Sequence, residues 1–121
     1  MANLNANFTK FMGDDFSLIF EVDGVGNIES GYSAIWAMSL ENPDNVNPSS
    51  TITKLIEKDS SDPSEINFSN NNVIVNIEKS DTETMVSGSY YHDCQLINTS
   101  TSTGGIIASG TFTLRTPLNK R

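Results

Sequence analysis

Apolar and polar residues alternate along most of this 121-residue chain, and this two-residue period restricts its fold more than any other feature. Successive side chains of a β-strand point to opposite faces of a sheet, so the alternation predicts half-buried strands. We find no sustained 3.6-residue period, which argues against a helical bundle. Apolar residues share one face in five stretches: Phe16, Leu18, Phe20 and Val22; Tyr32, Ala34, Trp36, Met38 and Leu40; Ile52 and Ile56; Tyr90, His92, Cys94 and Leu96; Ile106, Ala108, Gly110, Phe112 and Leu114.

Turn-forming residues separate these stretches. Three asparagines, 70–72, stand between two short apolar runs and predict a hairpin, because Asn tolerates a positive φ. The segment 98–105, rich in Ser and Thr and ending in two glycines, predicts a second hairpin. Residues 41–50 and 58–65 combine Pro with small polar residues and are expected to be surface loops. The segment 7–12 is a candidate eighth strand.

Seven or eight short strands separated by turns predict an all-β fold, an antiparallel immunoglobulin-like β-sandwich without a disulfide. A small β-barrel is the competing all-β architecture. The length corresponds to a single domain, residues 1–121. We expect its core to span about residues 8–116, between a flexible N-terminal arm (1–7) and a flexible C-terminal tail (117–121).

Two aromatic residues occupy places typical of such a sandwich. Trp36 lies in the middle of an early strand, where immunoglobulin-like domains carry a core Trp. Tyr90 enters a later strand directly after a turn, and a Tyr at this corner returns its hydroxyl to the upstream backbone. We expect Met85 and Val86 to pack beneath this turn.

Composition excludes several classes of function. The formal net charge is −8, from 15 acidic and 7 basic residues, whereas binding to a nucleic-acid duplex needs clustered Lys and Arg. The single Cys excludes an internal disulfide, and no Cys or His partners stand at the spacing of zinc ligands. No apolar run approaches the 18 or so residues of a membrane span, and the N-terminus lacks the apolar region of a signal peptide.

The only His and the only Cys lie close together, in the segment 85–94, and invite comparison with a catalytic pair. A Cys–His nucleophile pair needs the thiol and the imidazole within hydrogen-bond reach. His92 and Cys94 stand two residues apart on one face of a predicted strand, and Asp93 points to the opposite face. We therefore interpret His92 and Cys94 as structural residues, with an unreactive thiol, and predict no catalytic site.

Acidic and aromatic residues leave other ligands to consider. Residues 13–15 and 23–27 contain carboxylates in turns, but neither segment matches a calcium-binding loop, and we predict no metal and no cofactor. A carboxylate pair for glycoside hydrolysis stays open from sequence alone. A sugar platform would need exposed aromatic residues. With Trp36 assigned to the core, Tyr91 is the best exposed candidate.

The order of several short motifs resembles the immunoglobulin-like domain at the N-terminus of upper baseplate proteins of tailed phages, and of related phage tail proteins. The resemblance covers about residues 8–116. The matching residues are Gly13, Asp14, Phe16, Gly31, Trp36, Asp81, Thr82, Gly88, Tyr90, Asp93, Gly110, Phe112 and Leu114. In the baseplate proteins a coiled coil and a receptor-binding or fibre-anchoring part follow this domain, whereas this chain stops about five residues after its last predicted strand.

The resemblance implies a non-enzymatic virion structural protein that is made in the host cytoplasm. We expect a tail or baseplate adaptor or accessory subunit, which binds other phage proteins and copies of itself through sheet edges and chain ends, but neither nucleic acid nor membrane. A capsid decoration protein and a module that binds host-surface glycans are the alternatives. The candidate partner-binding residues are Tyr91 and the basic end of the acidic chain, Lys120 and Arg121.

Overall fold

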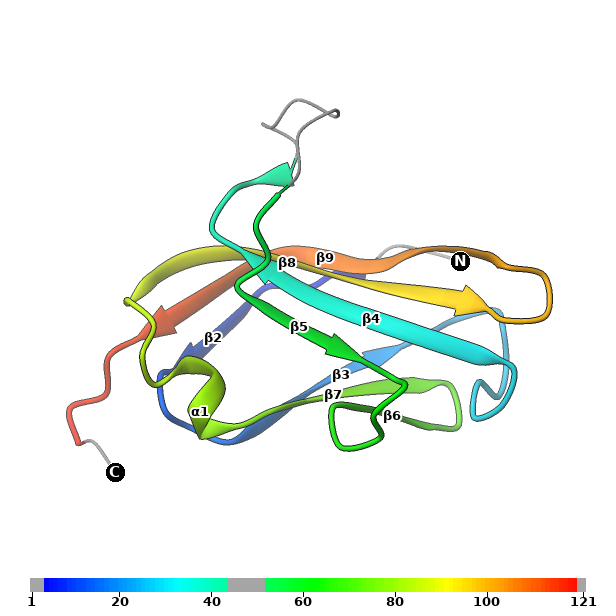
Figure 1. Ribbon diagram of the computed structural model, residues 1–121, viewed down its shortest axis with the longest axis horizontal. Helices are drawn as coiled ribbons and strands as arrows, with labels where there is room; N and C mark the ends of the chain where they lie inside the picture. The colour runs from blue at the N-terminus through cyan, green and yellow to red at the C-terminus, as the bar shows by residue number, and fades with distance from the viewer. Residues whose placement is uncertain (1–3, 44–51, 120–121) are drawn as a thin grey trace.

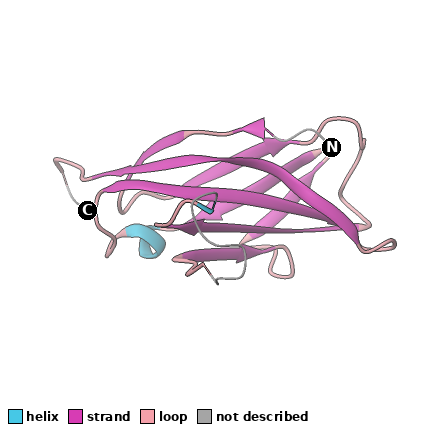
Figure 2. Ribbon diagram, turned by 90° about the horizontal axis from the view of Figure 1, so that it is seen from above, coloured by secondary structure: helices cyan, strands magenta, loops and turns pink. Residues whose placement is uncertain are grey.

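The computed structural model describes residues 4–43 and 52–119, and its strands form two sheets (Figures 1 and 2). The larger sheet contains β1 (Leu4–Asn5), β2 (Phe8–Phe11), β4 (Tyr32–Ser39), β5 (Ile56–Asp59), β8 (Gly88–Asn98) and β9 (Thr103–Arg115). The smaller sheet contains β3 (Phe16–Glu21), β6 (Ile66–Ser69) and β7 (Asn72–Ile77). One helical turn, α1 (Lys79–Thr82), follows β7. Two separate sheets make the fold a sandwich and not the competing barrel.

The strand order is that of an immunoglobulin-like domain. The larger sheet runs β1–β9–β8–β4–β5, with β2 also paired to β9, and the smaller sheet runs β3–β7–β6. In immunoglobulin terms β4, β8 and β9 are strands C, F and G, β5 is the added C′ strand, and β3, β7 and β6 are B, E and D. The expected disulfide-free immunoglobulin-like sandwich is confirmed, although the described residues form nine strands where seven or eight were predicted.

Alternating residues of the two sheets meet in one core, as the sequence pattern predicted. Trp36 is completely buried between the sheets, which confirms its predicted place. Tyr90, His92, Cys94 and Leu96 of β8 are buried on one face. The largest fully buried side chains are Trp36, Phe20, Phe112, Leu18, Ile28, Met38, Ile66, Leu96, Ile107, Leu114, Val73 and Val75.

Both predicted hairpins and the predicted tyrosine corner are present. Asn70 has a φ of 55° in the turn between β6 and β7, and β8 pairs with β9 across residues 99–102. The Tyr90 hydroxyl donates a hydrogen bond to the carbonyl of Val86. The expectation that Val86 packs beneath this turn is wrong, because its carbonyl faces Tyr90 while its side chain is 75% exposed. Met85 does pack against the core.

The predicted alternation fails at one place in β9, where a β-bulge shifts the register. Cys94 pairs with Ala108, but the next residue of β8, Gln95, pairs with Ile106, so that Ile107 is an extra residue. The extra residue reverses which side chains point inward. Ile107 is therefore buried, whereas Ile106, which was predicted to face the core, is 38% exposed.

The N-terminal segment, residues 4–11, is part of the larger sheet. Both β1 and β2 pair with β9 in parallel, which confirms a strand in the segment 7–12. These two parallel pairings depart from the antiparallel arrangement predicted for the sandwich as a whole. The prediction of a flexible arm over residues 1–7 is wrong for residues 4–7; residues 1–3 lie outside the described chain. The Ala6 amide donates to the Ser109 carbonyl at 2.9 Å, and the Asn7 side chain accepts from the Thr111 amide at 2.9 Å. These bonds hold the chain beside β9 between its two short strands.

Two other strand boundaries differ from the prediction. Leu40 was assigned to the core face of β4, but the strand ends at Ser39 and Leu40 is 63% exposed. Ile52 was placed on the same strand as Ile56, but β5 begins only at Ile56. The predicted loop 58–65 therefore begins with two strand residues. Of the predicted loop 41–50, residues 44–50 lie outside the described chain.

Candidate functional site

The inner face of β8 gathers the residues that first suggested chemistry. His92 is 5% exposed and lies among aromatic rings, with ring centroids 5.6 Å from Phe8, 5.9 Å from Trp36 and 5.8 Å from Phe112. The indole N–H of Trp36 donates to His92 Nδ1 at 3.0 Å. His92 Nε2 lies 2.7 Å from the Ala6 carbonyl oxygen. The imidazole thus joins the core Trp to the N-terminal segment.

The two hydrogen bonds fix the protonation state of His92. The indole of Trp36 can only donate, so Nδ1 must be the acceptor, and the carbonyl of Ala6 can only accept, so Nε2 must carry the proton. This is the neutral imidazole. Burial lowers the pKa of His92, although the Ala6 carbonyl and the charge of Asp93 act in the opposite direction. A proton added at Nδ1 would remove the hydrogen bond from Trp36.

His92 also stands at a position with a known structural role. In antibody domains the corner Tyr lies two residues before the second Cys of the inter-sheet disulfide, which packs on the core Trp. Here the residue two positions after Tyr90 is His92, which contacts Trp36 and lies 6.2 Å by ring centroids from Phe20 of the opposite sheet. An aromatic cluster with a hydrogen-bonded imidazole therefore takes the place of the disulfide.

Cys94 is a core residue, as predicted. Its side chain has no exposed surface, and burial raises the pKa of its thiol to about 12, with a smaller contribution from Asp93. A thiol with this pKa stays protonated near neutral pH, and only the thiolate is a good nucleophile. Both nitrogens of His92 are already engaged by Trp36 and Ala6. This arrangement agrees with the structural interpretation of both residues.

The outer face of β8 carries Tyr91 and Asp93 in a different setting. Both line a hollow of about 440 Å³ over the outer face of β8 and β9, together with Pro43, Ser109 and Thr111 among others. Tyr91 is half-buried there, so its prediction as an exposed aromatic residue is only partly correct. Burial raises the pKa of Asp93, while His92 and Lys54 lower it to a smaller extent. The hollow offers one aromatic ring, one carboxylate and several hydrogen-bonding groups.

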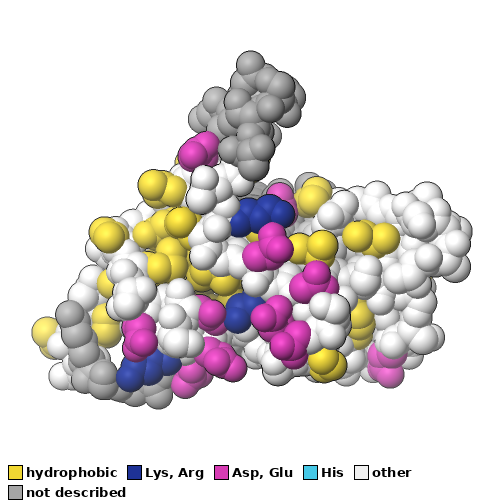
Figure 3. All heavy atoms as spheres, in the orientation of Figure 1, with side chains coloured by type: hydrophobic (Ala, Val, Ile, Leu, Met, Phe, Trp, Pro, Cys, Tyr) yellow, Lys and Arg dark blue, Asp and Glu magenta, His cyan; other side chains and the backbone are white. Residues whose placement is uncertain are grey.

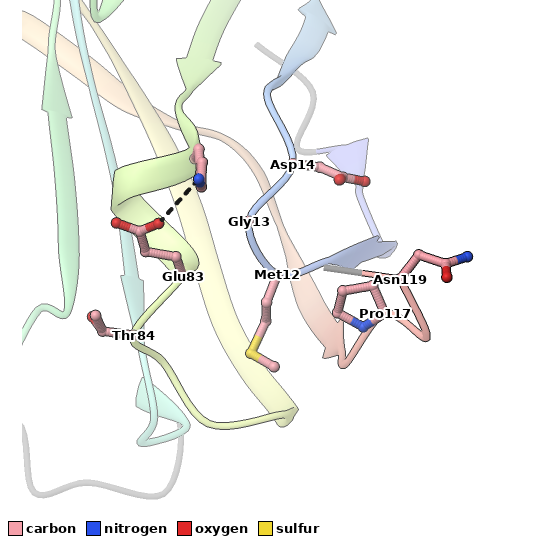
Figure 4. Close-up of a pocket in the computed structure, with 8 residues that line it drawn as sticks. Met12, Gly13, Asp14, Glu83, Thr84, Pro117 and Asn119 are labelled. Carbon is pink, nitrogen blue, oxygen red and sulfur yellow. Dashed lines mark ion pairs between the residues drawn. The ribbon is translucent and has the colours of Figure 1, made fainter. Parts of the chain in front are cut away.

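A second hollow, of about 310 Å³, lies at the end of the sandwich where β9 stops (Figure 4). β9 ends at Arg115, and the chain then passes along this hollow. Pro117 and Asn119 line it on one side, and Asp14 and Glu83 contribute carboxylates. Lys120 and Arg121, the predicted partner-binding residues of the tail, lie outside the described chain. Among the described residues, Pro117 and Asn119 line this hollow, whereas Tyr91 lines the other one.

Sequence reasoning did not find the roles of two residues that hold the domain together, Lys58 and Gly110. Lys58 of β5 is 8% exposed and forms an ion pair with Asp81 at 2.8 Å, which links the larger sheet to α1. Gly110 of β9 lies opposite His92, and a Cβ there would overlap the Ala6 carbonyl oxygen. Gly110 therefore makes room for the N-terminal segment. Lys58 could have been found from the alternation, because it lies two residues after Ile56 and its side chain is on the same, inward face of the strand.

The motif residues of the 79–90 region also serve the fold. The Thr82 hydroxyl is completely buried and accepts a hydrogen bond from the Gly13 amide at 2.9 Å. The Asp81 carboxylate accepts from the Glu78 amide at 2.8 Å in addition to its contact with Lys58. These contacts join the turn after β2 and the end of β5 to α1.

Metal and membrane sites receive no support within residues 4–43 and 52–119. No group of three His, Cys, Asp or Glu side chains gathers there in a way that could hold a metal ion. The α-helix α1 is four residues long, and no helix among the described residues is long and apolar enough to cross a membrane.

Comparison with known proteins gives a distant structural likeness. No protein-family model matches the chain, and no curated protein sequence matches it either. Among solved structures, the chain is similar to the extracellular domain of the voltage-gated sodium channel β4 subunit, described as a parallel homodimer that explains its role in cell–cell adhesion. The identity is 15%, the alignment covers 98% of this chain and 97% of that one, and the TM-score is 0.42.

Proposed function

We propose that this chain is a non-enzymatic structural subunit of a tailed-phage virion, an adaptor or accessory subunit of the tail or baseplate. It docks on a symmetric site of the particle through sheet edges and chain ends. The observation that carries this proposal is the use of the reactive residues: His92 and Cys94 are both enclosed in the core, where they support packing. With these residues enclosed, function is left to the surface of the domain. A surface made of strands acts by contacting other molecules.

The exposed apolar residues support a contact role. Figure 3 shows hydrophobic side chains gathered over the end of β4, the start of β5 and the segment between α1 and β8. The exposed large residues of these segments are Leu40, Leu55 and Val86, with exposed fractions of 63%, 47% and 75%. Exposed apolar residues that gather on one face are typical of interaction sites.

The order of motifs supports the assignment to phage tails. Gly13, Thr82 and Tyr90, which carry the resemblance to baseplate proteins, hold the same end of the sandwich, where β2 ends and β8 begins. The basic tail begins at this end as well, after Pro117. A short cationic end on an acidic domain would contact an acidic partner, and such contacts weaken with salt.

Incorporation into particles tests the proposal. Phage particles that encode this chain should contain it in a fixed copy number after density-gradient purification. A variant lacking residues 117–121 should be incorporated less than wild type, with the largest difference at low salt, where the charges of the tail are least screened. The melting temperature of that variant should stay nearly unchanged, because the deleted residues follow the last strand. A chain that is absent from purified particles contradicts the structural role. Wild-type occupancy of the truncated variant across a salt series contradicts the role of the tail.

The hollow around Tyr91 favours one alternative, adsorption to host-surface glycans. A sugar ring could stack on Tyr91 while Asp93 and Thr111 accept or donate hydrogen bonds. A glycan array separates this alternative from the adaptor role, since an adaptor should bind no glycan. Loss of a glycan signal with Tyr91→Ala, but not with the control Phe11→Ala at an exposed aromatic residue of β2, would support adsorption. The capsid decoration role is distinguished by locating the chain on the head of the particle.

A further inference from the structure

The outer edge of β3 is unpaired in the part of the chain that the structure describes. β3 pairs with β7 on one side only and forms the end of the smaller sheet. In immunoglobulin constant-type domains strand A pairs with strand B and covers this edge. Here the N-terminal strands β1 and β2 pair with β9 of the other sheet instead. The backbone of β3 is therefore left open to another strand.

The hydrogen-bond pattern identifies the free groups. The Val22 amide donates to the Asn71 carbonyl at 2.8 Å, one position beyond the pair of Glu21 and Asn72. Bonded positions alternate along an antiparallel ladder, so the even-numbered residues of β3 bond to β7. The N–H and C=O groups of Ser17, Ile19 and Glu21 consequently point to the open edge.

The side chains of β3 do not protect this edge. Natural sheets block open edges with Lys, Pro, bulges or very short strands. β3 is six residues long and has no Lys, Pro or bulge. Its one charged residue, Glu21, stands at the end of the strand, while Ile19 at its centre is 60% exposed. The edge strands β5 and β6 have only four residues each, and Pro63 precedes β6.

The edge is complementary to itself in one antiparallel register. With Ile19 opposite the Ile19 of a second copy, Ser17 lies opposite Glu21 and Glu21 opposite Ser17. This register pairs every free N–H and C=O group of the three residues. It also places an apolar contact on the two-fold axis and keeps the carboxylates of Glu21 apart. The register shifted by two residues toward the N-terminus would set Glu21 against Asp15, which like charges disfavour.

We propose that β3 pairs with β3 of a second copy of this chain, in antiparallel orientation about a two-fold axis at Ile19, to form a continuous six-stranded sheet. Such an isologous contact closes on itself and gives a dimer. The inference specifies one contact of the structural role proposed above and rests on that role only for its biological purpose. Its test uses the purified chain and does not depend on particles.

Sedimentation velocity over a concentration series measures the association. The wild-type chain should shift with concentration from its 13.2 kDa monomer to a species of twice that mass. Ile19→Lys should weaken the dimer by about tenfold or more, because it removes the apolar contact and sets two like charges opposite each other. Asn67→Lys is the matched control, since Asn67 is exposed on β6, at the other edge of the same sheet, and should leave the dimer unchanged.

Cysteine cross-linking tests the register. Opposed residues of a hydrogen-bonded antiparallel pair have Cα atoms about 5.5 Å apart, which suits a disulfide. Ile19→Cys should therefore cross-link to itself on mild oxidation, while Asn67→Cys should not. Ser17→Cys and Glu21→Cys should each stay monomeric in the denaturing gel alone, but form a cross-linked dimer when mixed. Cys94 is buried in all of these variants and stays out of the reaction.

Three results would overturn the inference. The first is a wild-type chain that sediments as a monomer at every concentration tested. The second is a dimer that resists Ile19→Lys, because another surface then makes the contact. The third is a dimer that shows no cross-link in either cysteine experiment. Each result leaves the incorporation test of the proposed function untouched, so the two proposals fail separately.

Discussion

The inner and outer faces of β8 place neighbouring residues of one segment in opposite surroundings. His92 and Cys94 face the core, where burial lowers the pKa of the imidazole and raises that of the thiol. Tyr91 and Asp93 face outward and line a hollow that solvent reaches. Four residues that look like one chemical cluster in the sequence are thus divided by the strand between packing and contact. Substitutions on the two faces should therefore differ in size and in pH dependence.

The largest effect is expected from the residue that packs on the inner face. Trp36→Ala should lower the free energy of unfolding by about 3–5 kcal/mol, because it removes a fully buried ring and the donor to His92. Denaturant unfolding followed by circular dichroism measures the change. An unchanged denaturation midpoint would mean that the inner face does not carry the stability of the fold.

A second substitution tests the imidazole itself. His92→Phe keeps a ring in the aromatic cluster but leaves the Trp36 indole N–H and the Ala6 carbonyl without partners, which should cost about 1–3 kcal/mol. His92→Gln, which can both donate and accept, should recover part of the loss. If His92→Phe and His92→Gln have the same free energy of unfolding, hydrogen bonding by His92 contributes nothing to the fold.

The same residue predicts a pH dependence. Because the pKa of His92 is lowered in the folded state, the unfolded chain binds more protons below about pH 6.5, and stability should fall as the pH drops toward the folded-state pKa. The difference in the free energy of unfolding between wild type and His92→Phe should therefore be smaller at pH 5 than at pH 7. Parallel loss of stability in both proteins would assign the pH dependence to other groups.

The reactivity of the Cys94 thiol should report that the inner face of β8 is buried. Ellman's reagent at neutral pH should modify the native chain only at the rate of unfolding, since the thiol is buried and its pKa lies near 12. Cys94→Ala should cost about 1 kcal/mol, typical of a small core change. Rapid, complete labelling without denaturant would place the thiol at the surface.

The smallest effect is expected on the outer face. Burial raises the pKa of Asp93, so its charged form is disfavoured in the folded state, and Asp93→Asn should stabilise the chain at neutral pH. Asp93 is partly exposed, so solvent screening should keep the gain below about 1 kcal/mol. The gain should disappear as the pH falls through the raised pKa, opposite in sign to the effect of His92. A loss of stability at pH 7 would show that the carboxylate makes a needed contact.

The local pattern of the sequence was sufficient for most of the fold. Alternation placed Trp36 and His92 in the core, and the corner position of Tyr90 predicted its hydrogen bond to upstream backbone. These features depend on residues a few positions apart. The bulge at Ile107 was not predictable in this way, because a single inserted residue leaves the apolar pattern on either side intact.

The partner strand of the N-terminal segment was equally beyond local pattern. Nothing within residues 4–11 indicates whether they pair with β3 or with β9, since that choice depends on Gly110, a hundred residues later. The residues of the candidate sites also fall into those that local pattern predicts and those that it does not. Tyr91 was found from its alternation, whereas the pair of Lys58 and Asp81 required the two sheets to be in place.

The bonds between the N-terminal segment and β9 also affect how the chain reaches its fold during synthesis. Asn7 and Thr111 are separated by 104 positions in the sequence, so the first strand has no partner until the last has been made. At a typical 5–20 residues per second the delay is roughly 5–20 s. After His92 has been made, the Ala6 carbonyl that accepts from its Nε2–H is still not held in place until β9 is complete. The nascent domain must therefore wait with an incomplete core, and its final assembly should be a late and slow step.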